Sequence, residues 1–195
     1  MFIATEAIGI ASSTVICNHQ ISGRLGVNQQ GLLDKSWHPP PPEWIKFNLD
    51  ASFHSSYKGG VGGICRDHKG RLLLAFGRSC VHWDIAHVES LAIKTINEVF
   101  KEWMLEYNGI IIEGDNFNII KLIHKKIKSG MEGLSFINNF NHVICNWVKR
   151  DSNKLADLCA NYAILSSFDW EDITLNKIPP YFLELLKEES VCCMH

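Results

Sequence analysis

Apolar and polar residues alternate in the first half of the chain, and this pattern predicts strands. Between residues 44 and 52 every second position is apolar, as in a half-buried strand. Two further short stretches, 61–66 and 71–78, flank the turn residues 67–70 and predict a hairpin. We therefore expect three consecutive antiparallel strands.

The apolar period then lengthens to that of a helix. Ala92, Ile96, Val99 and Trp103 share one predicted stripe of a helix over 85–106. The rest of the pattern predicts a buried strand at 109–113, a helix at 116–129, a strand at 143–148, a helix at 154–165 and a short helix at 182–186. The order βββαβαβα predicts an α/β fold in which helices pack on a five-stranded mixed sheet.

A run of prolines suggests a domain boundary. Residues 1–37 show no sustained period, and a run of four prolines follows at 39–42. We expect a weakly ordered extension at 1–37, a folded domain at 38–168, and a tail with a short helix at 169–195.

Composition narrows the class of protein. The 195 residues are 46% hydrophobic and 21% charged, and their formal net charge is −2. Such a chain has no global basic field, so binding of nucleic acid would depend on a local patch or on metal. The seven cysteines form no C-x-x-C pair, and no apolar run approaches the roughly 20 residues that span a bilayer. We expect a monomer inside the cell, in nucleus or cytoplasm, without a signal peptide or a membrane partner.

Four acidic residues occupy positions that ordinary surface does not explain well, namely Asp50, Glu89, Asp115 and Asp157. Each has a plain alternative as well. Glu89 and Asp157 can stabilise the first turn of a helix, Asp115 can cap one, and Asp50 can face solvent. Because ligands of α/β sheets bind beyond the carboxyl ends of strands, the four together instead predict a negatively charged pocket for divalent metal.

The segments around these acids carry a family pattern. They are residues 44–52, 60–67 with Gly70, 113–116, and 150–157. In this order they resemble a type 1 ribonuclease H domain, and most closely the plant variety associated with non-LTR retroelements. The resemblance covers roughly residues 37–187 and implies a ribonuclease H-like fold.

The resemblance also implies a chemistry. Asp50, Glu89, Asp115 and Asp157 would bind two Mg²⁺ ions, with Mn²⁺ as a substitute, about 3.5–4 Å apart. The expected activity is endonucleolytic hydrolysis of the RNA strand of an RNA–DNA hybrid. Residues expected to contact the nucleic acid are Ala51, Ser52, Asn116, Asn153 and the basic helix positions Lys121, Lys125 and Lys128.

Two positions depart from the family pattern and leave alternatives open. Ala51 stands where the family commonly has glycine, and Trp147 stands where it often has a histidine that assists catalysis. A domain that binds nucleic acid with little or no turnover is therefore one alternative. Another is an interaction module in which the acids are helix caps and the lysines a solvated face.

Overall fold

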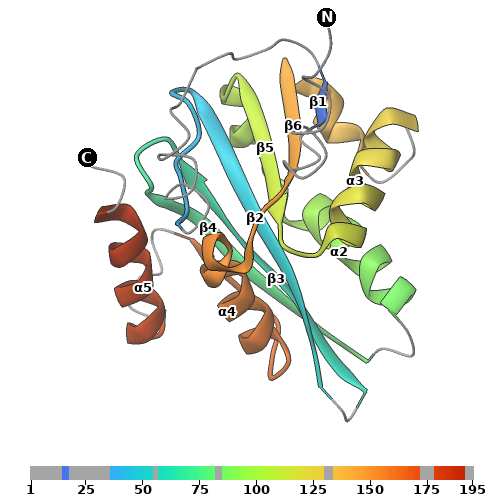
Figure 1. The fold of residues 1–195 in the computed structure, drawn as a ribbon, viewed down its shortest axis with the longest axis vertical. Coiled ribbons are helices and arrows are strands. Elements are labelled where there is room, and N and C mark those ends of the chain that lie inside the picture. Colours follow the sequence, from blue (N-terminus) through green and yellow to red (C-terminus); the bar gives the residue numbers. More distant parts are fainter. Residues whose placement is uncertain are drawn as a thin grey trace, which may run out of the picture.

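A computed structural model describes residues 15–17, 36–54, 57–81, 85–129, 134–171 and 178–191. In these residues one mixed sheet carries helices on both faces (Figure 1). The strands are β1 (Val15–Cys17), β2 (Trp44–Phe53), β3 (Lys58–Asp67), β4 (Leu72–Val81), β5 (Gly109–Gly114), β6 (His142–Trp147) and β7 (Phe168–Glu171). The helices are α2 (Ile85–Val99), α3 (Phe117–Ser129), α4 (Lys154–Ala163) and α5 (Pro180–Val191), with 3-10 turns η1 (Glu102–Glu106), η2 (Ser135–Asn139) and η3 (Arg150–Ser152).

The strand order is β1-β6-β5-β2-β3-β4-β7. Strands β2, β3 and β4 pair antiparallel, whereas β5 and β6 run parallel to β2. The expected α/β fold with a mixed sheet is confirmed, and the five predicted strands form its centre. Short strands β1 and β7 extend its two edges, so the described sheet has seven strands rather than five.

Helices α2 and α3 cover one face of the sheet. Ile45, Phe47 and Leu49 of β2 point into this layer, where they join the main hydrophobic core. Strand β5 is buried on both faces, as expected for a central parallel strand. The apolar stripes that predicted α2 and α3 therefore face the sheet.

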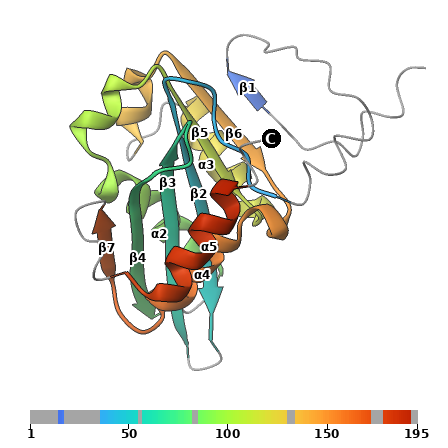
Figure 2. The same ribbon diagram turned by 90° about the vertical axis from the view of Figure 1, so that its left-hand side faces the viewer.

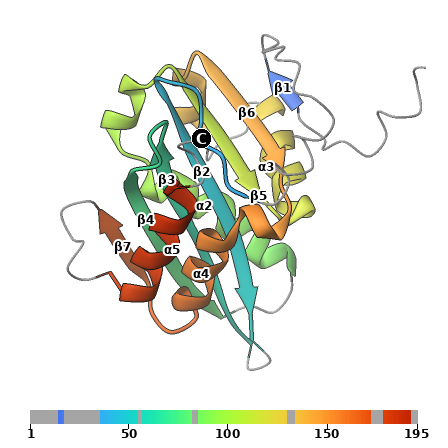
Figure 3. The same ribbon diagram turned by 60° about the vertical axis from the view of Figure 1, so that its left-hand side comes forward.

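Helices α4 and α5 cover the opposite face, in front of the sheet in Figures 2 and 3. At two positions of β3, helix α4 lies so close to the strand that a side chain has no room there. A Cβ added at Gly60 or Gly62 would collide with the backbone of Ala160. Glycine is required at these positions because of close approach, not because of an unusual turn.

The helix predicted over 85–106 is wrong in its second half. Helix α2 ends at Val99, and η1 follows after a break. Phe100 stacks on Phe136 with ring centroids 4.2 Å apart, and Met104 takes the fully buried place in η1. Trp103, predicted on the buried stripe, is 37% exposed. Packing around Phe100 thus overrides the apolar period.

The polar face of β2 is buried rather than open to solvent. Lys46 forms an ion pair with Glu113 at 2.8 Å, and Asn48 donates to the second oxygen of Glu113 at 3.3 Å. Arg66 forms an ion pair with Glu189 of α5 at 2.6 Å. Its guanidinium carbon lies 3.6 Å from the ring centroid of Trp37, which donates to Asn48. We call this set the buried polar network: Trp37, Lys46, Asn48, Arg66, Glu113 and Glu189.

This network ties the segment before β2 and the last described helix to the centre of the sheet. Of the extension predicted at 1–37, the described residues comprise only β1 and residues 36–37, so the prediction lies mostly outside them. No described helix has the length and apolarity needed to cross a bilayer.

Candidate active site

The carboxyl ends of β2 and β5 bring Asp50 and Asp115 together. These parallel strands pair so that Leu49 lies opposite Gly114. The next residue of the chain is an aspartate in both cases, Asp50 within β2 and Asp115 just after β5, so both acids reach the same edge of the sheet. The Asp115 backbone is held by the Trp147 indole, which donates to its carbonyl at 2.8 Å.

Asp50 is the buried member of the pair, with 6% of its surface exposed. Its Oδ1 accepts a hydrogen bond from the Ala51 amide at 2.8 Å. Burial raises the pKa of Asp50 from 3.8 to about 8, and the negative charges of Asp115 and then Asp157 add to this effect. The carboxylates of Asp115 and Asp157 are therefore close enough to Asp50 to oppose its ionisation.

Helix α4 supplies Asp157 from its first turn. Its Oδ2 accepts from Asn161 one turn later at 3.1 Å, and Asn161 in turn accepts from the Ser52 hydroxyl at 2.6 Å. This chain of bonds links the end of β2 to α4. The Asp157 side chain is 36% exposed and forms the open side of the cluster.

Arg150 lies over Asp115 and Asp157, which we call the two outer acids. Its Nε is 3.5 Å from Asp115 Oδ2, and one terminal nitrogen is 3.6 Å from Asp157 Oδ1. The side chain is 77% exposed. A cationic group thus already occupies the mouth of the acidic cluster.

Asn153 fixes the position of Asp115 relative to β2. Its amide nitrogen donates to the Leu49 carbonyl at 2.9 Å and to Asp115 Oδ1 at 3.1 Å. One buried side chain therefore connects β2, the acid after β5 and the start of α4. The sequence pattern had suggested Asn153 as a contact for nucleic acid, and that role stays a prediction.

Glu89 lies on the backbone of α2, but its side chain is outside the described residues. Among the described side chains, no group of three or more His, Cys, Asp or Glu residues meets the geometry of a metal site. The structure thus brings together three of the four predicted acids, and the place of the fourth carboxylate stays a prediction.

The alternative prediction that Asp115 caps a helix is wrong. Asn116, not Asp115, caps α3, since its Oδ1 accepts from the amides of Asn118 and Ile119. This leaves the Asp115 carboxylate available to the acidic cluster. Asn116 was predicted to contact nucleic acid, and its oxygen is committed to the cap.

The other predicted contacts differ in exposure. Ala51 and Ser52 are half-buried beside Asp50. Lys121, Lys125 and Lys128 are exposed on α3, opposite the buried Ile119, Ile120 and Ile123. These lysines form a basic helix face, as the pattern predicted, while their contact with nucleic acid stays a prediction.

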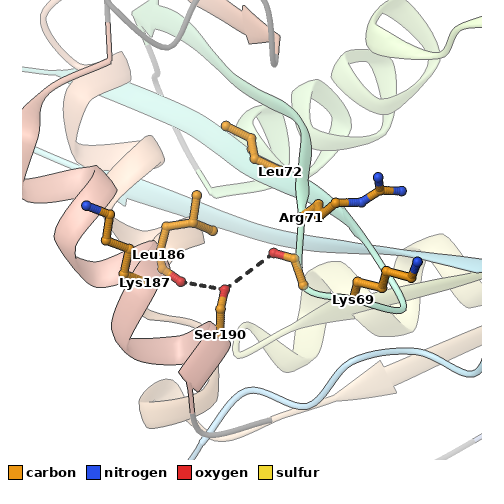
Figure 4. A pocket seen from close by; sticks show the side chains of 7 residues that line it. Lys69, Arg71, Leu72, Leu186, Lys187 and Ser190 are labelled. Atoms are coloured by element: carbon orange, nitrogen blue, oxygen red, sulfur yellow. Dashed lines mark hydrogen bonds between the residues drawn. The ribbon is translucent and has the colours of Figure 1, made fainter. Parts of the chain in front are cut away.

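A depression of about 330 Å³ lies elsewhere, between the β3–β4 turn and α5. Figure 4 shows Lys69 and Arg71 on the turn, Lys187 on the helix, and the Ser190 hydroxyl bonded to Leu186. In the β2–β3 pairing this turn lies five residues, roughly 16 Å, from Asp50. It contains none of the predicted site residues.

The profile of the family described as reverse transcriptase-like matches residues 48–163, which is more than half of the chain and spans all four acids. The chain belongs to this reverse transcriptase-like family. No curated protein gives a significant match.

Two solved structures are similar to this chain. The N-terminal RNase H domain of Rv2228c from Mycobacterium tuberculosis, solved as a fusion with maltose-binding protein, is 14% identical with a TM-score of 0.51. The match covers 62% of this chain and 93% of that one. RNase H1 from the halophilic archaeon Halobacterium salinarum NRC-1 is 16% identical with a TM-score of 0.48, covering 62% and 97%. The similarity to the first of these structures shows that the domain has the ribonuclease H fold.

The donor atoms of the acidic cluster suit a divalent cation, although the three described acids do not by themselves have the geometry of a metal site. Its donors are carboxylate oxygens, which Mg²⁺ and Mn²⁺ prefer. Burial and the negative charges of Asp115 and Asp157 raise the pKa of Asp50, and a bound cation would favour the ionised form of Asp50. The guanidinium of Arg150 against two of them indicates where positive charge is accepted.

Proposed function

We propose that this domain is a divalent-metal-dependent endoribonuclease that cleaves the RNA strand of RNA–DNA hybrids. The observation that carries the proposal is the convergence of Asp50, Asp115 and Asp157 at the carboxyl ends of β2 and β5. Membership in the reverse transcriptase-like family and the ribonuclease H fold support the same chemistry. We further propose the plant retroelement variety, because the Trp-x-Pro-Pro entry at 37–40 resembles it.

Asp50 would be the central metal ligand, with Glu89 and Asp115 on one side and Asp157 on the other. Bound Mg²⁺ would supply Lewis-acid activation and neutralise charge at the scissile phosphodiester. The protein's own contribution is orientation. Asn153 holds Asp115 against β2, and Asn161 holds Asp157 toward the cluster.

The exposed lysines of α3 would bind the backbone of the hybrid. Lys121, Lys125 and Lys128 are spaced so that their side chains project from one side of the helix. Each phosphate contact adds salt-sensitive affinity without sequence preference. Substrate choice would therefore follow the shape of the duplex more than its sequence.

Trp147 supports a second candidate, a domain that binds hybrids but turns over slowly. Its indole donates to the Asp115 carbonyl, and it occupies the position where the family pattern often has a histidine. Tryptophan offers neither a base nor an acid near neutral pH. Proton transfer would then fall to solvent.

One assay separates the two candidates. A hybrid labelled on its RNA strand is incubated with protein and Mg²⁺, beside the Asp50→Asn variant and a duplex of DNA alone. If the domain is an enzyme, wild type should produce RNA fragments only when metal is present, and Asp50→Asn should produce none. Retention of the hybrid in a binding assay without fragments would instead establish the binding domain, and absence of both would refute both candidates.

A further inference from the structure

The guanidinium of Arg150 contacts those oxygens of the outer acids that no described side-chain amide uses. Asp115 accepts from Asn153 through Oδ1 and faces Arg150 through Oδ2. Asp157 accepts from Asn161 through Oδ2 and faces Arg150 through Oδ1. The two amides thus orient the carboxylates, and Arg150 covers the oxygens that remain for a cation.

We propose that Arg150 is an exchangeable counter-cation: it neutralises Asp115 and Asp157 in the metal-free protein, yields to divalent metal, and then binds a backbone phosphate of the nucleic acid. The inference rests on the proposed function, since it assigns a residue of the same site to the metal and the substrate in turn. The acid cluster and Asn153 are the fixed parts of the site, and Arg150 is its movable part.

The geometry of the contact suits such an exchange. Both nitrogen–oxygen distances, 3.5 and 3.6 Å, are those of ion pairs rather than of short directional hydrogen bonds. With its side chain 77% exposed, Arg150 gains little from the pair, because water screens it. A divalent ion would displace the guanidinium at small cost.

The backbone below the side chain is well held. The Ser152 amide donates to the Lys149 carbonyl, and the Asn153 amide donates to the Arg150 carbonyl, each at 2.9 Å. The side chain can therefore turn while its Cα stays beside the acids. A guanidinium binds phosphate oxygens with two parallel donors, so this position suits a phosphate close to the metal.

The test compares Arg150→Gln with wild type in two binding measurements. Mn²⁺ affinity is measured by titration calorimetry without nucleic acid. Affinity for an RNA–DNA hybrid is then measured in Mn²⁺ by rapid mixing, before the RNA strand is cleaved, with Asp50 left intact because it is a proposed metal ligand. Lys154→Gln is the matched control, since it removes one exposed positive charge only four residues away.

Arg150→Gln should bind Mn²⁺ about threefold more tightly, because no guanidinium competes for the two acids. It should bind the hybrid about tenfold more weakly, and the dependence of affinity on salt should lose about one phosphate contact. Arg150→Lys should restore most of the salt dependence but less of the affinity. Lys154→Gln should change neither affinity more than about twofold.

Opposite changes in the two affinities support the exchange, because loss of a merely structural residue would weaken both. Unchanged Mn²⁺ affinity in Arg150→Gln overturns the inference, as do equal effects in Lys154→Gln. Both of these outcomes leave the proposed function standing if wild type binds Mn²⁺ and hybrid. Failure of wild type to bind either one overturns the function and the inference together.

Discussion

Replacing Asp50 with asparagine should stabilise the metal-free protein against unfolding, and the gain should grow as the pH rises. Asparagine has nearly the same shape and keeps an oxygen for the Ala51 amide, which donates to Asp50 at 2.8 Å. It differs in never carrying a charge. The wild-type carboxyl is buried and faces Asp115 and Asp157, so its ionisation is opposed in the folded protein but not in the unfolded chain.

The size of the effect follows from the pKa of Asp50, which burial and then Asp115 raise from 3.8 to about 8. The folded-state pKa of Asp50 lies above its unfolded value. The protonated Asp50 carboxyl therefore contributes its full stability below about pH 3.8, and this stability is lost as the pH rises through about 8. One pKa unit corresponds to about 1.4 kcal/mol, so the full displacement corresponds to about 6 kcal/mol. Arg150 and solvent on the open side of the cluster screen the charge, and we expect about 3 kcal/mol.

Urea denaturation in the presence of a chelator measures this difference at several pH values, from about 4.5 to about 8.5. The free energy of unfolding of Asp50→Asn minus that of wild type should increase with pH by the stated amount. Asp151→Asn, which removes an exposed carboxylate, should give a nearly flat difference. A flat difference for Asp50→Asn would show that Asp50 ionises as an ordinary surface acid, and the electrostatic account of the site would then be refuted.

Three further variants test the packing around the site. Gly62→Ala should lower the free energy of unfolding by about 2 kcal/mol or more in urea, because its Cβ would meet the backbone of Ala160; full stability would contradict the close approach of α4. Glu189→Leu should lower the free energy of unfolding in urea by about 3–5 kcal/mol, because it leaves the charge of Arg66 buried without its partner. The double variant with Arg66→Met should lose less stability, and equal losses would argue against a buried ion pair. Trp147→Phe should lower the free energy of unfolding by about 1 kcal/mol, because it removes the hydrogen bond to the Asp115 carbonyl. Thermal unfolding with and without Mn²⁺ should also show a smaller rise in melting temperature than in wild type. An unchanged rise would mean that the indole does not position Asp115.

The sequence predicted the centre of the site because that part depends on local rules. Two parallel strands end at the same edge of a sheet, so an aspartate at the end of β2 and another just after β5 had to approach each other. Asp157 could be placed as well, since its helix follows directly on the neighbouring strand. The hydrophobic period likewise predicted the buried faces of α2 and α3.

Features that depend on distant contacts were not predictable in this way. The burial of Lys46 and Arg66 follows from Trp37 and from α5, and nothing in the alternating pattern of β2 shows that a helix more than a hundred residues later covers its polar face. The break after Val99 has a similar cause, because Phe100 turns toward Phe136. The position of Arg150 over the acids also needed the fold, since sequence adjacency does not fix a long side chain.

The ion pair between Arg66 and Glu189 has a consequence for synthesis on the ribosome. The two residues are 123 positions apart, so β3 emerges long before its partner helix is translated. Until α5 arrives, the nascent sheet must leave the guanidinium of Arg66 in water or accept a buried charge without its carboxylate. The face that α5 covers should therefore stay open to chaperones during translation, and the domain should complete folding only when α5 has left the exit tunnel.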